Sequence, residues 1–196
     1  MAIFKALSKE REFYAHHDLL SNCSSVIAEA LEASARGLET RFVNLDADEW
    51  LLELFQQWLY FGDWKWPCND MRNSNYREQH EHDDGCDSAP TQVEIVEVIS
   101  FANNYEILDL LQDASELLCE ELNSGEGVDE NAIFVAQSKL CRFSPVLKVI
   151  AEAYAMCGTL DGVEYMFYEG LKPSFIRVVM FEFSQLRDNE AGKTQT

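Results

Sequence analysis

The feature that most constrains the fold of this chain is an aromatic-rich apolar pattern near residue 50. Its large side chains recur at positions i, i+1, i+4, i+5, i+8 and i+9, and they are Trp50, Leu51, Leu54, Phe55, Trp58 and Leu59. This spacing places all of them on one face of an α-helix, where two tryptophans and a phenylalanine require burial against several partners. The acidic segment 46–49 precedes the pattern and is typical of a capping box, with Glu49 at the third helical position.

Three short strands are predicted before this helix. Residues 2–7 and 11–16 are extended candidates separated by a turn, which indicates a hairpin. Phe13 and Ala15 would share one face of the second strand, because successive side chains alternate along a strand. Residues 41–45 are the third strand candidate.

Between the second and third strands, the sequence predicts one or two short amphipathic helices. Apolar side chains recur there at three- and four-residue spacing, and they are Leu19, Leu20, Cys23, Val26, Ile27, Ala30 and Leu31. Asp18 is the expected N-cap, and Gly37 is expected to stop the helical segment.

Composition changes abruptly after Trp66. Residues 67–91 contain six acids, two bases and almost no aliphatic side chains. Such a segment cannot bury enough apolar surface to offset its ordering, so we expect a long exposed or disordered loop. Periodic apolar residues return from Gln92 and predict two helices up to residue 122, joined near 103–105.

The two helices expected within residues 92–122 carry eight acids and no base, and no Lys or Arg occurs between Arg77 and Lys139. These acids form either a solvated face or a docking surface for a basic partner. A linker rich in glycine follows at 123–127. Four further helical segments are then expected, followed by a polar, frayed tail from Arg187; the four are 132–140, 145–157, 160–170 and a last one opened by Lys172 and Pro173.

Charge and composition exclude several function classes. Acids outnumber bases 35 to 15, for a net charge of −20, so binding to nucleic acid or to an anionic membrane face is disfavoured. No window approaches the ~20 apolar residues of a membrane span, and the N-terminal segment lacks the apolar region of a secretion signal. Six cysteines without close pairs indicate reduced thiols, so a cytoplasmic or nuclear protein is expected.

No catalytic or cofactor motif is found. His16 and His17 precede Asp18 without a nucleophile motif, and Cys23 has no flanking base that would lower its pKa, so we do not expect an enzyme. The one set of metal-ligand residue types is Cys68, His80, His82 and Cys86. Structural zinc sites favour close Cys-x-x-Cys pairs, so a solvated loop without metal is the preferred interpretation.

Three strings within residues 2–122 resemble the BTB/POZ domain, most closely the variety abundant in filamentous fungi. Residues 13–20 (FYAHHDLL) are similar to its strand-to-helix junction, and Ser24 stands where the family commonly has a serine. Residues 44–62 resemble its third strand and a helix that ends in Leu-Tyr-x-Gly. Residues 100–107 (SFANNYEI) resemble its Ala-x-x-Tyr helix joint.

The sequence departs from the family at several points. His17 stands where Lys or Arg is usual, and Val26-Ile27 stand where an aromatic residue is common. The segment that usually precedes the first strand is not seen before Ala2. Strand-exchanged dimerisation uses that segment, so this arrangement is disfavoured, and a shortened paralogue is one possibility. Residues 67–91 lengthen a connection that is short in animal members.

The resemblance implies an α+β fold, with a small three-stranded sheet capped by helices at residues 1–122 and an all-helical extension at 123–196. It implies a non-catalytic protein–protein interaction module, with His16 in a structural role. We expect a homodimer or hetero-oligomer whose interface includes Leu19, Leu20, Cys23, Val26 and Ile27. One alternative is a substrate adaptor that binds a cullin-type ubiquitin-ligase scaffold; another is a small metalloprotein with the Cys/His loop site.

Overall fold

The structure is a computed structural model of the chain. It describes residues 2–6, 11–34, 41–62, 90–124, 127–157 and 171–193. In these segments, eight helices and a three-stranded mixed sheet form an α+β fold, as predicted.

Packing divides the chain into two compact units. Unit 1 comprises residues 1–90 and 101–111, and unit 2 comprises residues 91–100 and 112–196. The domain boundary predicted between residues 122 and 123 stays a prediction.

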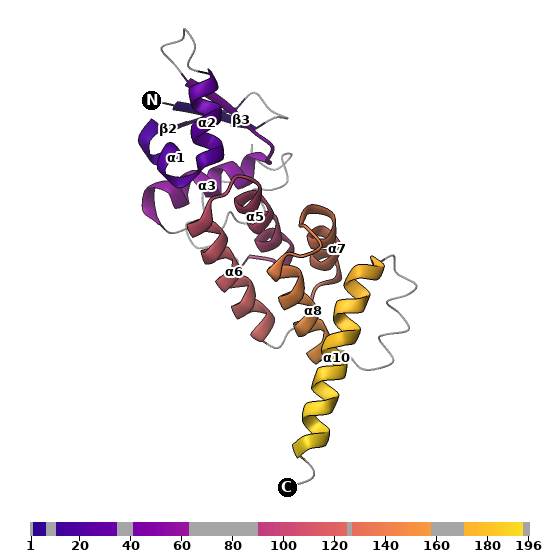
Figure 1. The fold of residues 1–196 in the computed structure, drawn as a ribbon. Coiled ribbons are helices and arrows are strands. Elements are labelled where there is room, and N and C mark those ends of the chain that lie inside the picture. Colours follow the sequence, from indigo (N-terminus) through magenta and orange to yellow (C-terminus); the bar gives the residue numbers. More distant parts are fainter. Residues whose placement is uncertain are drawn as a thin grey trace, which may run out of the picture. The chain divides into compact units, whose positions relative to one another are not determined.

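Unit 1 contains the sheet (Figure 1). Strands β1 (Ala2–Ala6) and β2 (Glu12–Ala15) pair antiparallel, and β3 (Arg41–Leu45) pairs parallel with β1, which gives the order β2-β1-β3. The predicted hairpin and the predicted third strand are therefore confirmed.

The inner face of the sheet is lined with apolar side chains. Phe4 of β1 is paired in register with Phe13 of β2, and their stacked ring centroids are 5.3 Å apart. Phe13 and Ala15 are both buried, whereas Tyr14 between them is exposed, so the predicted alternation along β2 is confirmed. Val43 of β3 extends the same buried row.

Two short helices follow β2: α1 (His17–Cys23) and α2 (Ser25–Ser34). The prediction that Asp18 caps the first helix is wrong, because His16 is the N-cap and Asp18 lies in the first turn. A carboxylate there still interacts favourably with the helix dipole. The expected stop at Gly37 lies outside the described residues.

Helix α3 (Glu49–Phe61) is the aromatic-rich helix of the sequence pattern. The predicted capping box is wrong: Asp48 is the N-cap, its side chain makes no capping bond, and Glu49 is the first helical residue. The Glu49 and Glu53 carboxylates instead pair with the Arg11 guanidinium. The helix ends at Gly62, whose φ of 65° is left-handed and whose N–H donates to the Trp58 carbonyl at 2.8 Å.

Burial along α3 differs in part from the prediction. Phe55 is 1% exposed, and its ring centroid lies 5.8 Å from that of Phe4 and 5.2 Å from that of Phe101. The two tryptophans, Trp50 and Trp58, are only half-buried. The buried face is completed by leucines beside Phe55, which are Leu51, Leu52 and Leu54. The small sheet is not large enough to cover both indole rings as well.

Helices α5 (Gln92–Asn104) and α6 (Leu108–Asn123) match the two helices predicted there. A capping box that the sequence analysis missed begins α5: the Glu94 carboxylate accepts from the Thr91 N–H at 2.8 Å, and the Glu94 N–H lies 3.4 Å from the Thr91 hydroxyl. The end of α5 is a Schellman-type turn. Glu106 occupies its left-handed position with φ 53°, and the Ile107 N–H donates to the Ala102 carbonyl at 2.8 Å.

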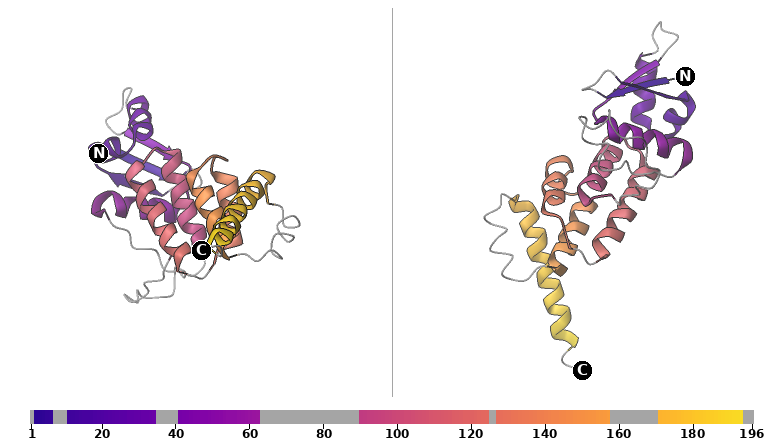
Figure 2. Two further views of the ribbon diagram at one scale, coloured as in Figure 1. Left: turned by 60° about the horizontal axis from the view of Figure 1, so that its bottom comes forward. Right: turned by 180° about the vertical axis from the view of Figure 1, so that it is seen from behind.

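Three further helices belong to unit 2: α7 (Glu130–Lys139), α8 (Pro145–Cys157) and α10 (Pro173–Lys193). Both views of Figure 2 show α8 and α10 side by side, and the two helices pack together. The predicted bounds of α8 and start of α10 are confirmed, whereas the helix predicted at 160–170 lies outside the described residues. The tail predicted to fray from Arg187 remains helical to Lys193. A membrane-spanning helix is not found among the described segments, where every helix is too short or too polar for a bilayer.

The position of Phe55 generates a stability prediction. Phe55→Ala leaves a cavity between β1, α3 and the end of α5, so we expect the free energy of unfolding to fall by about 3–5 kcal/mol. Urea denaturation followed by circular dichroism measures this change. Phe61→Ala is the matched control, because Phe61 on the same helix is 80% exposed and its loss should change stability by no more than about 0.5 kcal/mol. Equal effects of the two substitutions would contradict the assignment of Phe55 to the core.

Candidate interaction surface

The three strings that resemble the BTB/POZ domain contact one another in unit 1. The first contact is made by Tyr60, near the end of α3, with His16, at the end of β2. The Tyr60 hydroxyl accepts from the His16 backbone N–H at 3.1 Å and lies 3.1 Å from His16 Nδ1, with the ring centroids 5.8 Å apart. Tyr60 therefore joins the end of α3 to the junction between β2 and α1.

The second contact is made by Tyr105, at the joint after α5. Its hydroxyl accepts from the Asp46 backbone N–H at 2.6 Å, and its carbonyl accepts from the Ser24 hydroxyl. Burial raises the pKa of the Tyr105 phenol, so this group stays protonated over the physiological range. Tyr105 therefore joins the segment after β3 to the start of α2.

Ser24 connects these segments through a single buried hydroxyl. The hydroxyl donates to the Tyr105 carbonyl and accepts from the Ile27 N–H at 3.0 Å, which makes Ser24 the N-cap of α2. The side chain is 2% exposed, so water cannot replace either bond. Ser24 thus fixes the direction in which α2 leaves the end of α1.

Removing this hydroxyl tests the joint. Ser24→Ala leaves the Ile27 N–H and the Tyr105 carbonyl without the Ser24 partner, so we expect the free energy of unfolding to fall by about 1–3 kcal/mol. The neighbouring Ser25→Ala is the control, since the Ser25 hydroxyl donates to Glu106 at an exposed position, and its loss should cost about 0.5 kcal/mol. Chemical denaturation of both variants makes the comparison. An S24A variant as stable as S25A would show that the joint does not hold α2.

The five residues predicted as an interface divide into two groups. Leu20 and Ile27 are fully buried in the core of unit 1. Leu19 is 36% exposed, and Cys23 and Val26 are half-buried. Only Leu19, Cys23 and Val26 therefore remain accessible to another chain.

Cys23 is a packing residue on this surface. Its thiol donates to the Leu20 carbonyl at 3.2 Å, and burial raises its pKa to about 11. The group is therefore a neutral thiol at physiological pH, unlike an activated nucleophile. The neighbouring His17 ring lies 3.2 Å from an Asp18 carboxylate oxygen and 3.4 Å from the Ser21 hydroxyl.

A second apolar surface, which the sequence analysis did not identify, lies on the outer face of the sheet. Tyr14, Ile3 and Phe42 stand opposite one another on β2, β1 and β3. Tyr14 is 45% exposed and Phe42 is 36% exposed, whereas Ile3 between them is only 8% exposed, so the two aromatic side chains supply the accessible area. We call these three residues the sheet stripe. The alternation of Phe13 and Tyr14 signalled an outward side chain, but the strand register that aligns the three residues is a tertiary property.

Polar groups border the sheet stripe. Lys5 and Glu12 form an ion pair at 2.6 Å, and the Tyr14 hydroxyl donates to Glu12 at 2.8 Å. The Lys5 ammonium also lies 5.5 Å from the centroid of the Phe42 ring. An apolar centre with a polar border is the general anatomy of protein–protein interfaces.

The acidic residues within 92–122 differ in their surroundings on α5 and on α6. On α5, the Glu94 carboxylate is buried in the capping box, and Glu97 pairs with Lys139 at 2.8 Å. On α6, Asp113, Glu116 and Glu120 are exposed at three- and four-residue spacing, which places them on one helix face. We call these three residues the α6 stripe.

The metal-ligand candidates Cys68, His80, His82 and Cys86 lie outside the described residues. Within the described segments, no group of three or more His, Cys, Asp or Glu side chains is placed to hold a metal ion.

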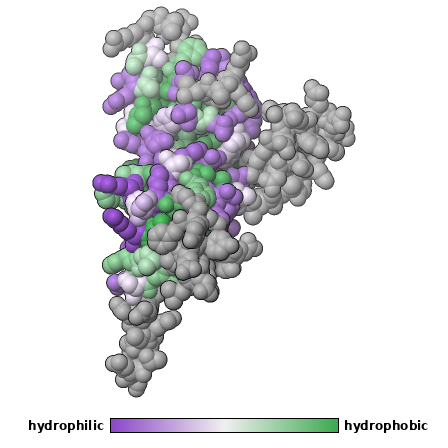
Figure 3. Space-filling view, turned by 90° about the vertical axis from the view of Figure 1, so that its right-hand side faces the viewer, coloured by the Kyte–Doolittle hydropathy of each residue, from purple (hydrophilic) through white to green (hydrophobic). Residues whose placement is uncertain are grey.

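Exposed apolar residues are scattered on the face shown in Figure 3, where hydrophobic and hydrophilic residues alternate over short distances.

No protein-family model matches the chain, and no curated relative was found.

Proposed function

We propose that residues 1–122 form a BTB/POZ-like domain whose function is non-catalytic protein–protein interaction. One observation carries this proposal: the three strings that resemble the family meet through Ser24, Tyr60 and Tyr105 rather than lying apart. The mixed sheet and the helices around it support the same assignment. The absence of a cofactor and of an enzymatic activity remains a prediction from the sequence.

The proposed mechanism is self-association through apolar surface of unit 1. Leu19, Cys23 and Val26 supply accessible apolar atoms on α1 and α2, and their burial against a second copy would be driven by the hydrophobic effect. A standard interface of ~800 Å² per partner needs more area than three side chains, and we include the exposed Tyr14 and Phe42 of the sheet stripe as the second contributor. The ion pair of Lys5 with Glu12 would then lie at the rim and favour a matched partner.

A charge placed on α1 tests this mechanism. Leu19→Glu puts a carboxylate where the partner should bury a leucine, so we expect the dimer dissociation constant to rise by about tenfold or more. Leu108→Glu is the matched control, because Leu108 is a more exposed leucine of the same unit, at 70%, and lies outside the proposed interface. Sedimentation velocity across the micromolar range measures both constants.

Two outcomes would overturn the proposal. The first is that the wild-type chain sediments as a monomer at all concentrations. The second is that L19E and L108E weaken the dimer equally. Circular dichroism of both variants distinguishes a lost interface from a lost fold.

The α6 stripe favours a second candidate, the substrate adaptor for a cullin-type scaffold. Three exposed acids on one helix face could select a basic partner surface and accelerate its association. We expect the double variant Glu116→Lys/Glu120→Lys to lose retention on an immobilised cullin N-terminal region. Glu130→Lys/Glu182→Lys makes the same charge change elsewhere in unit 2 and should retain binding. If neither the wild-type chain nor the control variant is retained on the cullin region, this candidate is eliminated.

A further inference from the structure

Two described segments of unit 2 carry more basic than acidic side chains, although the chain as a whole is acidic. The sequence carries a net charge of −20 and has no Lys or Arg from residue 78 to residue 138. In residues 131–157 and 171–181, five side chains are basic and one, Glu152, is acidic. The five are Lys139, Arg142, Lys148, Lys172 and Arg177.

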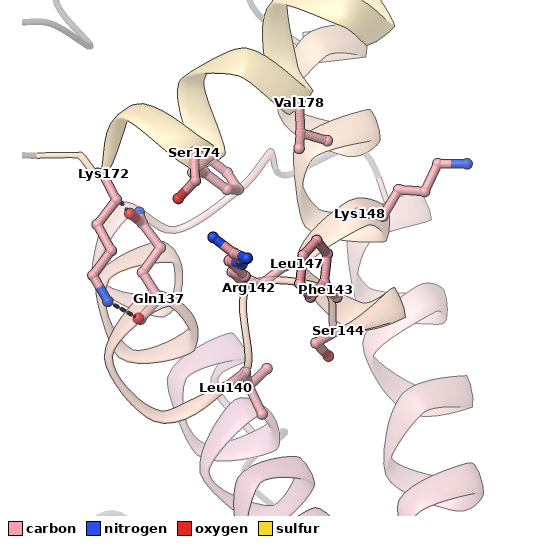
Figure 4. Close-up of a pocket in the computed structure, with 11 residues that line it drawn as sticks. Gln137, Leu140, Arg142, Phe143, Ser144, Leu147, Lys148, Lys172, Ser174 and Val178 are labelled. Carbon is pink, nitrogen blue, oxygen red and sulfur yellow. Dashed lines mark hydrogen bonds between the residues drawn. The ribbon is translucent and has the colours of Figure 1, made fainter.

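Three of these bases, Arg142, Lys148 and Lys172, line a pocket of about 260 Å³ (Figure 4). It is formed by the end of α7, the turn before α8 and the first turns of α8 and α10. Its apolar lining consists of Leu140, Phe143, Leu147, Phe175 and Val178. Its polar lining consists of Gln137, Arg142, Ser144, Lys148, Lys172 and Ser174.

The amide of Gln137 is a buried donor at this pocket. Its Oε1 accepts from the Lys172 backbone N–H at 2.7 Å, which fixes the orientation of the amide because a flipped amide would place two donors together. Gln137 is 6% exposed, and its Nε2 has no hydrogen-bond partner within the described part of the chain. The amide of Gln92 in the same unit uses both of its ends, on Gly127 and Asp129. A buried donor without an acceptor is costly, so an acceptor from a ligand would be favoured there.

Two cations at the pocket also lack a carboxylate partner in the described segments. Lys139 pairs with Glu97 at 2.8 Å and Lys148 with Glu152 at 3.2 Å, but no such ion pair is made by Arg142 or Lys172. The Arg142 guanidinium lies 4.4 Å from the centroid of the Phe143 ring. The Lys172 ammonium donates to the backbone carbonyl of Gln137, and its other two N–H donors remain for further hydrogen bonds.

The polar groups converge on one space. In Figure 4 the Arg142 guanidinium, the Gln137 amide and the Ser174 hydroxyl point toward the same region, whereas Lys148 points away from it. Arginine binds carboxylates through two parallel hydrogen bonds, so a carboxylate there could be bound by Arg142 with additional donors beside it.

We propose that this pocket binds a carboxylate carried on an apolar group, as presented by a partner polypeptide where an acidic residue or a C-terminus adjoins an apolar side chain. The carboxylate would bind Arg142 and accept from Ser174 and Gln137, while the apolar group would contact Phe143 and Phe175. The volume is below the roughly 300–1,000 Å³ of pockets for drug-sized ligands, which suits one or two residues of a peptide.

The lining favours this ligand over an inorganic anion. Five of the lining residues are apolar, and they give a phosphate or sulfate ion nothing to contact. The net charge of −20 also repels a dianion more strongly than a single carboxylate. The site lies entirely within unit 2, so its occupancy is separate from the self-association proposed for unit 1.

Two probes that differ at a single group, a carboxylate or an amide, test the proposal on the full chain. N-acetylphenylalanine carries a ring, an amide and a carboxylate, and N-acetylphenylalanine amide replaces the carboxylate by a neutral group. We expect the acid to cause saturable changes in the NMR amide signals of Arg142, Phe143 and Lys172 at millimolar concentration. The amide probe should bind at least tenfold more weakly.

A matched pair of variants assigns the effect to the pocket. Arg142→Gln should weaken binding of the acid at least tenfold, whereas Arg177→Gln removes the same charge from an exposed position of α10 outside the lining and should not. Three results would overturn the proposal: equal binding of both probes, equal loss in R142Q and R177Q, or saturable binding of inorganic phosphate without binding of the acid. Unchanged sedimentation of R142Q would show that the pocket and the dimer are independent, so failure of one proposal does not imply failure of the other.

Discussion

The packing of Phe55 is the contact on which the rest of unit 1 depends. Its ring touches Phe4 on the central strand and Phe101 near the end of α5, so one side chain joins the sheet, α3 and a helix more than 40 residues away in sequence. The hydrophobic effect supplies the attraction but no direction. Direction comes from the hydrogen bonds of Tyr60 and Tyr105, which fix where β2, α2 and the segment after β3 begin and end.

Apolar packing and these hydrogen bonds together decide which surfaces remain accessible to other molecules. Leu20 and Ile27 are buried in the core, whereas Leu19 is exposed and Val26 is half-buried. On the sheet, packing of one face against α3 leaves the Tyr14–Ile3–Phe42 stripe on the other face. In unit 2, by contrast, the distinctive surface is electrostatic, because Arg142 and Lys172 stand without carboxylate partners in the described part of a strongly acidic chain.

Helix caps show where a local pattern stops being sufficient. The acidic residues before α3 fit a capping box by composition, but Glu49 is the first helical residue and pairs with Arg11, which is 38 residues away. The capping box that does form joins Thr91 to Glu94 by the same chemistry. Local pattern shows which groups can cap a helix, whereas competing long-range partners decide which groups do. Trp50 and Trp58 illustrate the same limit for burial, since helical spacing places them on the apolar face but not under a neighbour.

The sequence alone determined the order and type of the elements: three short strands, the aromatic helix, and the bounds of α8 to the residue. These are properties of periodicity, turn residues and proline position, all of which act within a few residues of chain. Only the tertiary structure decided the parallel pairing of β1 with β3, the alignment of the sheet stripe, and the meeting of Gln137, Arg142 and Ser174 at one pocket. Those features bring together residues that are far apart in sequence, and interactions between neighbouring residues do not determine which distant segments pack together.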